Sequence, residues 1–276
     1  MKEALIGSSL GTGFTFLMTV FGSAMVMFFK NKQNEFVQKI FLGFAAGVMI
    51  AASVWSLLIP AIEKAEERGE IGWIPAAGGC VLGVCFLIGV DYFLSYLLSD
   101  AEKFFKTDRL GGQQLSWKRT VLLILSVTLH NIPEGMATGL AFALAMQNGN
   151  DHTLIASAWA LAIGIGIQNF PEGAAISLPL RQEGMYRGKA FLFGSLSGTV
   201  EPIFGIGVTL IAHKIMPYMP WFLAFAAGAM LYVVVQELIP QIHLDDYDYE
   251  GRMVHLGTVG VITGFLVMMI LDVSLG

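Results

Sequence analysis

Long runs of hydrophobic residues, separated by short polar segments, follow one another along the whole chain of 276 residues. Each run is about 20 residues or longer, which is the length that an α-helix needs to cross a bilayer core. The pattern predicts an all-α polytopic membrane protein, with eight transmembrane helices in one domain that covers residues 1–276. These helices are expected at about 4–29, 36–59, 73–98, 118–146, 153–180, 188–213, 219–240 and 254–275.

The composition agrees with a chain that lies mostly in lipid. Hydrophobic residues make up 55% and charged residues only 13%, against roughly 25% charged residues in soluble domains. The partner predicted from this composition is the lipid bilayer. The net charge of −5 and the lack of a basic stripe give no indication of nucleic-acid binding. The spacing of Cys80 and Cys85 does not share a helix face and predicts free, buried thiols.

The lysines and arginines predict the orientation of the chain. If the amino terminus lies outside, the loops on the inner side hold most of the 16 basic residues, and only Lys2, Lys64, Arg68 and Lys214 remain outside. This positive-inside bias predicts that both termini face outward, because an even number of helices returns the carboxyl terminus to the starting side.

Two apolar helices share a repeated sequence. The segment 44–49 (FAAGVM) recurs at 225–230 (FAAGAM), and Leu58-Ile59-Pro60 recurs as Leu238-Ile239-Pro240. The two helices would cross the membrane in opposite directions. Such an inverted repeat is typical of transporters, in which two related halves exchange shapes around a site near the midplane.

Polar residues interrupt two neighbouring apolar runs in a related pattern, 130–135 (HNIPEG) and 168–173 (QNFPEG). On a helix, His130, Asn131 and Glu134 project toward one side, and Gln168, Asn169 and Glu172 repeat this arrangement. The proline in each copy frees a backbone carbonyl from the helical ladder. Such polarity is costly in hydrocarbon unless it faces the bundle interior and serves a ligand. Carboxylates, one imidazole and neutral oxygens suit Zn2+, and also Cd2+, Fe2+ or Mn2+.

The paired segments resemble the signature of the ZIP family of metal transporters, in its prokaryotic GufA-like branch. The resemblance covers nearly the whole chain and implies the same topology, with the eight helices in a 3+2+3 arrangement. It implies that the protein is not an enzyme but moves a divalent metal ion into the cytoplasm across the cell (inner) membrane. A bundle of the first, fourth, fifth and sixth spans would carry the ion past a scaffold of the others, in an elevator-like form of alternating access.

The resemblance also implies two adjacent metal sites. The transport site would use His130, Glu134, Gln168 and Glu172, with Met49 as a further soft ligand. Asn131, Asn169 and Glu201 would complete a second site through the two shared glutamates, so that a second Zn2+ or Cd2+ could be bound. Some relatives carry an aspartate at the position of Asn169, which would make the second site weaker here.

Several positions also have a purely structural interpretation. Met49 can be a gap-filling core residue, and Asp91 and Asp272 lie toward span ends, where solvated end caps are expected. The loop 241–255, with its histidines and acidic residues, is either a solvated linker or a collecting site for released metal. An intramembrane metal-dependent hydrolase and a metal-gated membrane receptor are the alternative functions, but the hydrolase motif His-Glu-x-x-His is absent. A homodimer is left open.

The predicted orientation can be tested by labelling single cysteines in a variant that lacks Cys80 and Cys85. An impermeant thiol reagent applied to intact cells should label cysteines placed in the loop 61–72 and should not reach those placed in 99–117. Labelling of the loop 99–117 would show that the orientation is inverted.

Overall fold

The computed structural model describes residues 2–28, 35–104, 117–147, 152–182, 184–243 and 255–275. Every regular element in these ranges is helical, so the predicted all-α fold is confirmed. The long helices are α1 (Lys2–Phe28), α2 (Glu35–Ala52), α4 (Trp73–Phe104), α5 (Trp117–Gln147), α6 (His152–Gln182), α8 (Val200–Ile215), α9 (Met219–Val233) and α11 (Leu256–Leu275). The shorter segments are η1 (Ser53–Leu58), α3 (Ile59–Glu66), α7 (Arg187–Ser197), η2 (Met216–Tyr218), η3 (Val234–Leu238) and α10 (Ile239–His243).

Six stretches of the described residues are long and apolar enough to cross a membrane. They are Lys2–Phe28, Lys39–Glu66, Trp73–Phe93, His152–Arg181, Arg187–Leu238 and Leu256–Ser274. The fifth stretch is 52 residues long and contains both α8 and α9. Helix α5 is not among the six; it is 31 residues long and carries His130, Asn131 and Glu134 within its apolar run. A multi-pass membrane protein is thus confirmed, and the number of eight crossings stays a prediction.

The helices that begin as α2 and α9 both widen before a proline. The π-helical segments η1 and η3 are followed by Pro60 and Pro240. Because proline has no amide hydrogen, the carbonyls of Ser56 and Gln236, four residues earlier, lose their usual helical partner. Local π turns accommodate such interruptions inside membrane helices. The helix therefore continues through η1 and α3 to Glu66, beyond the expected end near residue 59.

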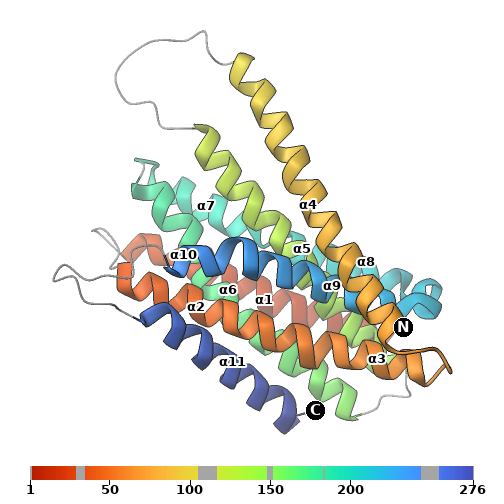
Figure 1. The fold of residues 1–276 in the computed structure, drawn as a ribbon. Coiled ribbons are helices and arrows are strands. Elements are labelled where there is room, and N and C mark those ends of the chain that lie inside the picture. Colours follow the sequence, from red (N-terminus) through yellow and green to blue (C-terminus); the bar gives the residue numbers. More distant parts are fainter. Residues whose placement is uncertain are drawn as a thin grey trace.

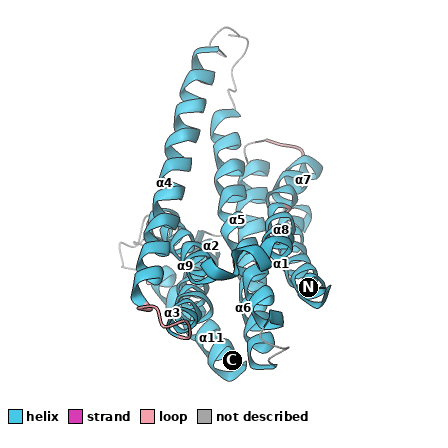
Figure 2. Ribbon diagram, turned by 90° about the vertical axis from the view of Figure 1, so that its right-hand side faces the viewer, coloured by secondary structure: helices cyan, strands magenta, loops and turns pink. Residues whose placement is uncertain are grey.

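The four most extensive helix contacts are those of α1 with α6, α5 with α8, α2 with α11, and α4 with α9. Figure 1 shows that α2 and α9 run in opposite directions and that both chain termini lie toward the same end of the bundle. Figure 2 shows α4 extending beyond the other helices at the opposite end.

The glycines of the repeated F-A-A-G-x-M segments make equivalent contacts. A Cβ atom on Gly47 would collide with the carbonyl oxygen of Val261 in α11. A Cβ atom on Gly228 would collide in the same way with the carbonyl oxygen of Cys80 in α4. Small residues permit this approach of two helix backbones, so the repeat marks two corresponding helix contacts.

The two contacts are also reciprocal. Gly264 of α11 lies against the carbonyl of Phe44, and Gly83 of α4 lies against the carbonyl of Phe225. The two phenylalanines are the first residues of the two repeated segments. The pair α2–α11 and the pair α4–α9 therefore pack through matching positions, as an internal repeat requires.

Two intramembrane aspartates also occupy related places in these pairs. Asp272 of α11 is only 6% exposed and accepts a hydrogen bond from the Ser56 hydroxyl of η1. Asp91 of α4 accepts a hydrogen bond of 2.7 Å from the Tyr232 hydroxyl of α9. The expectation of solvated end caps is wrong for Asp272, because the close contact of α11 with α2 covers its carboxylate.

The cysteines on α4 are unpaired, as predicted. Cys80 is half-buried, but Cys85 is exposed, so the predicted burial of Cys85 is wrong. Helix α4 packs mainly against α9, and its remaining surface carries exposed apolar side chains such as Leu82 and Phe86. Cys85 therefore belongs to a surface that suits contact with lipid.

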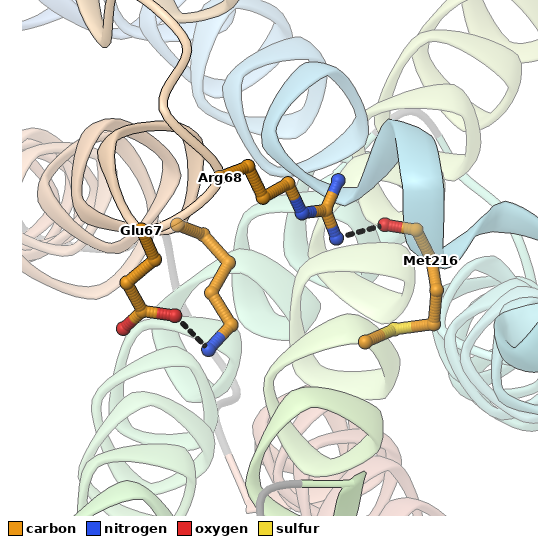
Figure 3. Close-up of polar contacts among 4 residues, drawn as sticks. Glu67, Arg68 and Met216 are labelled. Carbon is orange, nitrogen blue, oxygen red and sulfur yellow. Dashed lines mark hydrogen bonds and ion pairs between the residues drawn. The ribbon is translucent and has the colours of Figure 1, made fainter.

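The turn after α3 forms hydrogen bonds with the turn between α8 and α9. Arg68 donates hydrogen bonds to the carbonyl oxygens of Met216 and Pro217, while Lys64 pairs with Glu67 nearby at 2.6 Å (Figure 3). The guanidinium thus adds hydrogen bonds to carbonyl groups next to the end of α8. The two turns therefore lie on the same side of the bundle, as the predicted orientation requires.

The close approach of α9 to α4 can be tested by adding one methyl group. Gly228→Ala should destabilise the protein by about 1–3 kcal/mol, because the new Cβ forces two backbones apart. Gly89→Ala on α4 is the matched control, since no atom lies within 4 Å of its Cβ position. Thermal unfolding of the purified protein in detergent measures both, and equal melting temperatures would contradict the packing.

Candidate metal-binding site

The two half-sites lie in the middle of α5 and α6, and each keeps its proline inside the helix. The glycine after each glutamate is closed in by another helix. A Cβ atom on Gly135 would collide with the carbonyl of Glu201 in α8, and one on Gly173 with the carbonyl of Thr19 in α1. These two glycines therefore bring α5 against α8 and α6 against α1, which places polar residues of four helices together.

Gln168 and Glu134 connect the two half-sites directly. The Gln168 amide nitrogen, Nε2, donates a hydrogen bond of 2.6 Å to Oε1 of Glu134, and both side chains are fully buried. The second carboxylate oxygen of Glu134, Oε2, and the amide oxygen of Gln168, Oε1, have no hydrogen-bond partner. The contact thus leaves two acceptors unsatisfied at the interface of α5 and α6.

Two asparagines are held in the same way. Asn131 donates through Nδ2 to the carbonyl of Ser197 at 3.1 Å. Asn169 donates through Nδ2 to Oε2 of Glu201 at 2.8 Å and to the carbonyl of Thr15 at 3.3 Å. The Oδ1 atoms of both asparagines are buried and have no hydrogen-bond partner.

The three amide groups therefore share one orientation, with the nitrogen bonded to protein and the oxygen left free. A buried acceptor without a partner costs about 1–3 kcal/mol, and four such oxygens belong to the two half-sites. A cation satisfies several of them at once. No three His, Cys, Asp or Glu side chains among the described residues gather closely enough to hold a metal ion. The free amide oxygens are available to such an ion beside the carboxylates.

Hydrogen bonds join four of the predicted site residues in two pairs. Glu134 meets Gln168, and Asn169 meets Glu201. Glu172, one turn after Gln168 on α6, is only 9% exposed. All five side chains are buried in the described structure, and their role as metal ligands stays a prediction.

The remaining predictions concern His130, Met49 and the loop 241–255. The side chain of His130 and the loop residues 244–254 lie outside the described part of the structure. Met49 is fully buried in an apolar cluster that also contains Leu161 and Ile165 of α6. This environment fits the core interpretation of Met49, and its part in metal binding stays a prediction.

Sequence analysis missed the contribution of α1. Thr19 donates a hydrogen bond of 3.3 Å to Oε1 of Glu201, and the carbonyl of Thr15 holds Asn169. A signal was present, because buried Ser and Thr residues recur every three or four positions along this helix. Such spacing places hydroxyl groups on one interior face.

Known proteins with similar sequences identify the family of this chain. The model of the family described as ZIP Zinc transporter matches residues 106–272. Zinc transporter ZIP11 of Xenopus tropicalis is 37% identical, over 99% of this chain and 98% of the relative. The chain belongs to the ZIP family of zinc transporters.

Bacterial members of the ZIP family are also similar to this chain. Zinc transporter GufA of Myxococcus xanthus is 34% identical, over 85% of this chain and 86% of its own length. Zinc transporter ZIPB of Bordetella bronchiseptica is 34% identical, over 99% of this chain and 81% of its own length. The resemblance drawn from the two half-sites is thereby confirmed.

The predicted role of the Gln168 amide oxygen as a ligand can be tested with Gln168→Leu. This change removes one free acceptor and leaves Oε1 of Glu134 without its donor, so the metal-free protein should lose about 1–3 kcal/mol of stability. The rise in melting temperature on adding Zn2+ should also shrink strongly. Gln236→Leu, at an exposed position of η3, is the matched control, and an equal Zn2+ response in both variants would exclude Gln168 as a ligand.

Proposed function

We propose that this ZIP protein moves divalent transition-metal ions, with Zn2+ as the main substrate, into the cytoplasm across the cell (inner) membrane. The observation that carries the proposal is the cluster of unpartnered oxygens in the middle of α5 and α6. Relatives named zinc transporters, which match over nearly the whole chain, support Zn2+. Cd2+, Fe2+ and Mn2+ suit the same mixture of ligands. Because the members of this family are transporters, the protein is not an enzyme.

The transport site is formed by His130, Glu134, Gln168 and Glu172, with Met49 as a fifth, soft ligand. Two carboxylates compensate the charge of a divalent cation, and the Gln168 oxygen adds a neutral ligand. The buried position of Glu134 and Gln168 supports this assignment, because ionisable and amide groups in a membrane interior usually face one another or a ligand.

A second ion lies beside the first. Asn131, Asn169 and Glu201 provide its own ligands, and Glu134 and Glu172 are shared between the two ions. The free Oδ1 atoms of both asparagines support this site. Its occupant is a second Zn2+ or Cd2+, held more weakly because Asn169 brings no negative charge.

The chain crosses the membrane eight times in a 3+2+3 arrangement, with both termini outside. Alternating access results when one group of helices moves against the other. The bundle of α1, α5, α6, α7 and α8 moves against a scaffold of α2, α4, α9 and α11. The helix pairs support this division, because α1–α6 and α5–α8 lie within the bundle and α2–α11 and α4–α9 within the scaffold. The hydrogen bonds of the site also join only bundle helices, so the ion and its ligands travel together.

Contacts between bundle and scaffold are suited to sliding. Met268 of α11 lies against Gly164 of α6, and apolar contacts of this kind have no directional bond that must break.

The two alternative functions have less support. An intramembrane hydrolase needs a catalytic His-Glu-x-x-His motif, which the sequence lacks. A metal-gated receptor would need a signalling part, and none is visible in the described residues.

Zn2+ uptake by purified protein in liposomes tests the proposal. His130→Ala, Glu134→Ala and Glu172→Ala should each reduce uptake by roughly tenfold or more, because an incomplete ligand shell leaves polar groups buried and unpaired. Glu201→Gln should have a milder effect, since it keeps the shape and a neutral oxygen while the second ion weakens. Glu70→Gln in an exposed turn is the control.

Metal content is measured on the same preparations, at equal amounts of reconstituted protein. Normal transport by His130→Ala would exclude this histidine as a ligand. Loss of uptake in Glu201→Gln as complete as in Glu172→Ala would contradict the division into two sites. Uptake across a panel of Zn2+, Cd2+, Fe2+ and Mn2+ gives the preferred ion.

A further inference from the structure

Glu201 differs from Glu134 in how its carboxylate is satisfied. It is fully buried, and both of its oxygens accept hydrogen bonds, Oε1 from Thr19 at 3.3 Å and Oε2 from Asn169 at 2.8 Å. The Thr15 hydroxyl also lies within hydrogen-bond range of this carboxylate. Glu134 has one bonded oxygen and one unpartnered oxygen. A metal ion that uses Glu201 must therefore displace a hydrogen-bond donor, whereas an ion at Glu134 finds a free acceptor.

The Thr19 hydroxyl has an alternative partner within its own helix. It lies 3.3 Å from the carbonyl oxygen of Thr15 and 3.3 Å from Oε1 of Glu201. A hydroxyl group carries only one hydrogen, so it can donate to one of these two acceptors at a time. When the Glu201 carboxylate binds another group, the hydroxyl can donate to the Thr15 carbonyl instead. The hydroxyl hydrogen then still has an acceptor.

We propose that Thr19 is a positioning residue that sets the affinity of the second metal ion by donating to Glu201 when that ion is absent. When the ion binds, the hydroxyl donates to the carbonyl of Thr15 instead and releases Oε1. Thr19 touches the carboxylate and not the transported ion at the Glu134–Gln168 side. This inference rests on the proposed two-ion function and assigns a residue that controls one of the two ions.

The position of Thr19 in the fold supports this role. Its backbone carbonyl lies against Gly173, one residue after Glu172, and its side chain lies against Gly198, three residues before Glu201. Neither glycine has room for a larger side chain. Thr19 is therefore fixed at the crossing of α1 with α6 and with the junction of α7 and α8. A change of hydrogen-bond partner needs only a rotation of the hydroxyl hydrogen about the Cβ–Oγ bond.

Asn169 reinforces the same effect on the other carboxylate oxygen. Its Nδ2 atom is held between Glu201 and the carbonyl of Thr15, while its Oδ1 atom is free. The amide thus shields Oε2 and presents only a neutral oxygen to an ion. An aspartate at this position would replace a donor by an acceptor and would leave Glu201 less well satisfied without metal.

Calorimetric titration of the purified, full-length protein with Zn2+ and with Cd2+ tests the role of Thr19. Thr19→Val keeps the shape of the side chain but removes the hydroxyl. The metal-free state then loses a hydrogen bond to a charged carboxylate, whereas the metal-bound state loses only the weaker one to the neutral Thr15 carbonyl. The second ion should therefore bind roughly five- to tenfold more tightly, which corresponds to the difference between the two hydrogen bonds. The first ion should bind with unchanged affinity, and Asn169→Asp should shift the second ion in the same direction.

Two variants separate this role from a general effect on packing. Thr19→Ser keeps the hydroxyl and should restore the wild-type affinity for the second ion. Thr12→Val removes a buried hydroxyl of the same helix that donates to the Ser8 carbonyl and touches no carboxylate, so it should also behave as wild type. If Thr19→Val does not fold, Thr19→Ala is titrated in its place.

The outcomes also distinguish this inference from the proposed function. An unchanged or weaker second ion in Thr19→Val, or no second ion in any variant, would overturn the role of Thr19 while Zn2+ uptake remained intact. An equal gain in Thr12→Val would overturn it as well. Absence of any Zn2+ binding that depends on Glu134 would instead contradict the proposed function itself.

Discussion

The structure depends on one constraint, namely that a polar atom inside a membrane protein needs a partner. In α5 and α6 the donors meet this requirement and the acceptors do not. The nitrogens of Asn131, Gln168 and Asn169 all reach protein oxygens, while their own oxygens remain free. In this region the amide nitrogens have hydrogen-bond acceptors, whereas buried oxygens have no hydrogen-bond donor. A cation completes the region with few added groups, because one ion can accept several oxygen ligands.

This imbalance requires helices that approach each other very closely. Asn131 reaches Ser197 at the end of α7, next to the point where α5 approaches α8 at Gly135. Asn169 reaches the carbonyl of Thr15 in α1, which α6 approaches at Gly173. A larger residue at either glycine would separate the helices and would leave the amide nitrogens unpaired as well. The P-E-G motif therefore has three coupled physical roles: the proline opens the helical ladder, the glutamate supplies charge, and the glycine brings in the helix that orients the neighbouring amide.

The sequence was sufficient for the parts of the fold that follow from spacing along one helix. Apolar runs predicted the helices, and the period of the helix placed Glu134 and Asn131 on one side of α5. Contacts between helices were less accessible. Asp272 near the end of α11 looks solvated until its partner Ser56 is known, and Thr19 looks like an ordinary small residue until Glu201 is placed beside it. The π turn before Pro60 was equally hidden, because the sequence marks the proline but not the turn that accommodates it.

The two carboxylates that face the half-sites also imply an order of binding in the proposed mechanism. An ion that arrives at Glu134 meets an unpartnered oxygen, so it gains a ligand without breaking a hydrogen bond. An ion that arrives at Glu201 must first displace Thr19 or Asn169. In the proposed two-site mechanism, the transport site would therefore fill before the second site at low metal concentration. Because the two sites would share Glu134 and Glu172, a second ion withdraws negative charge from the first and favours its release, so that occupancy of the second site would regulate how long the transported ion stays bound.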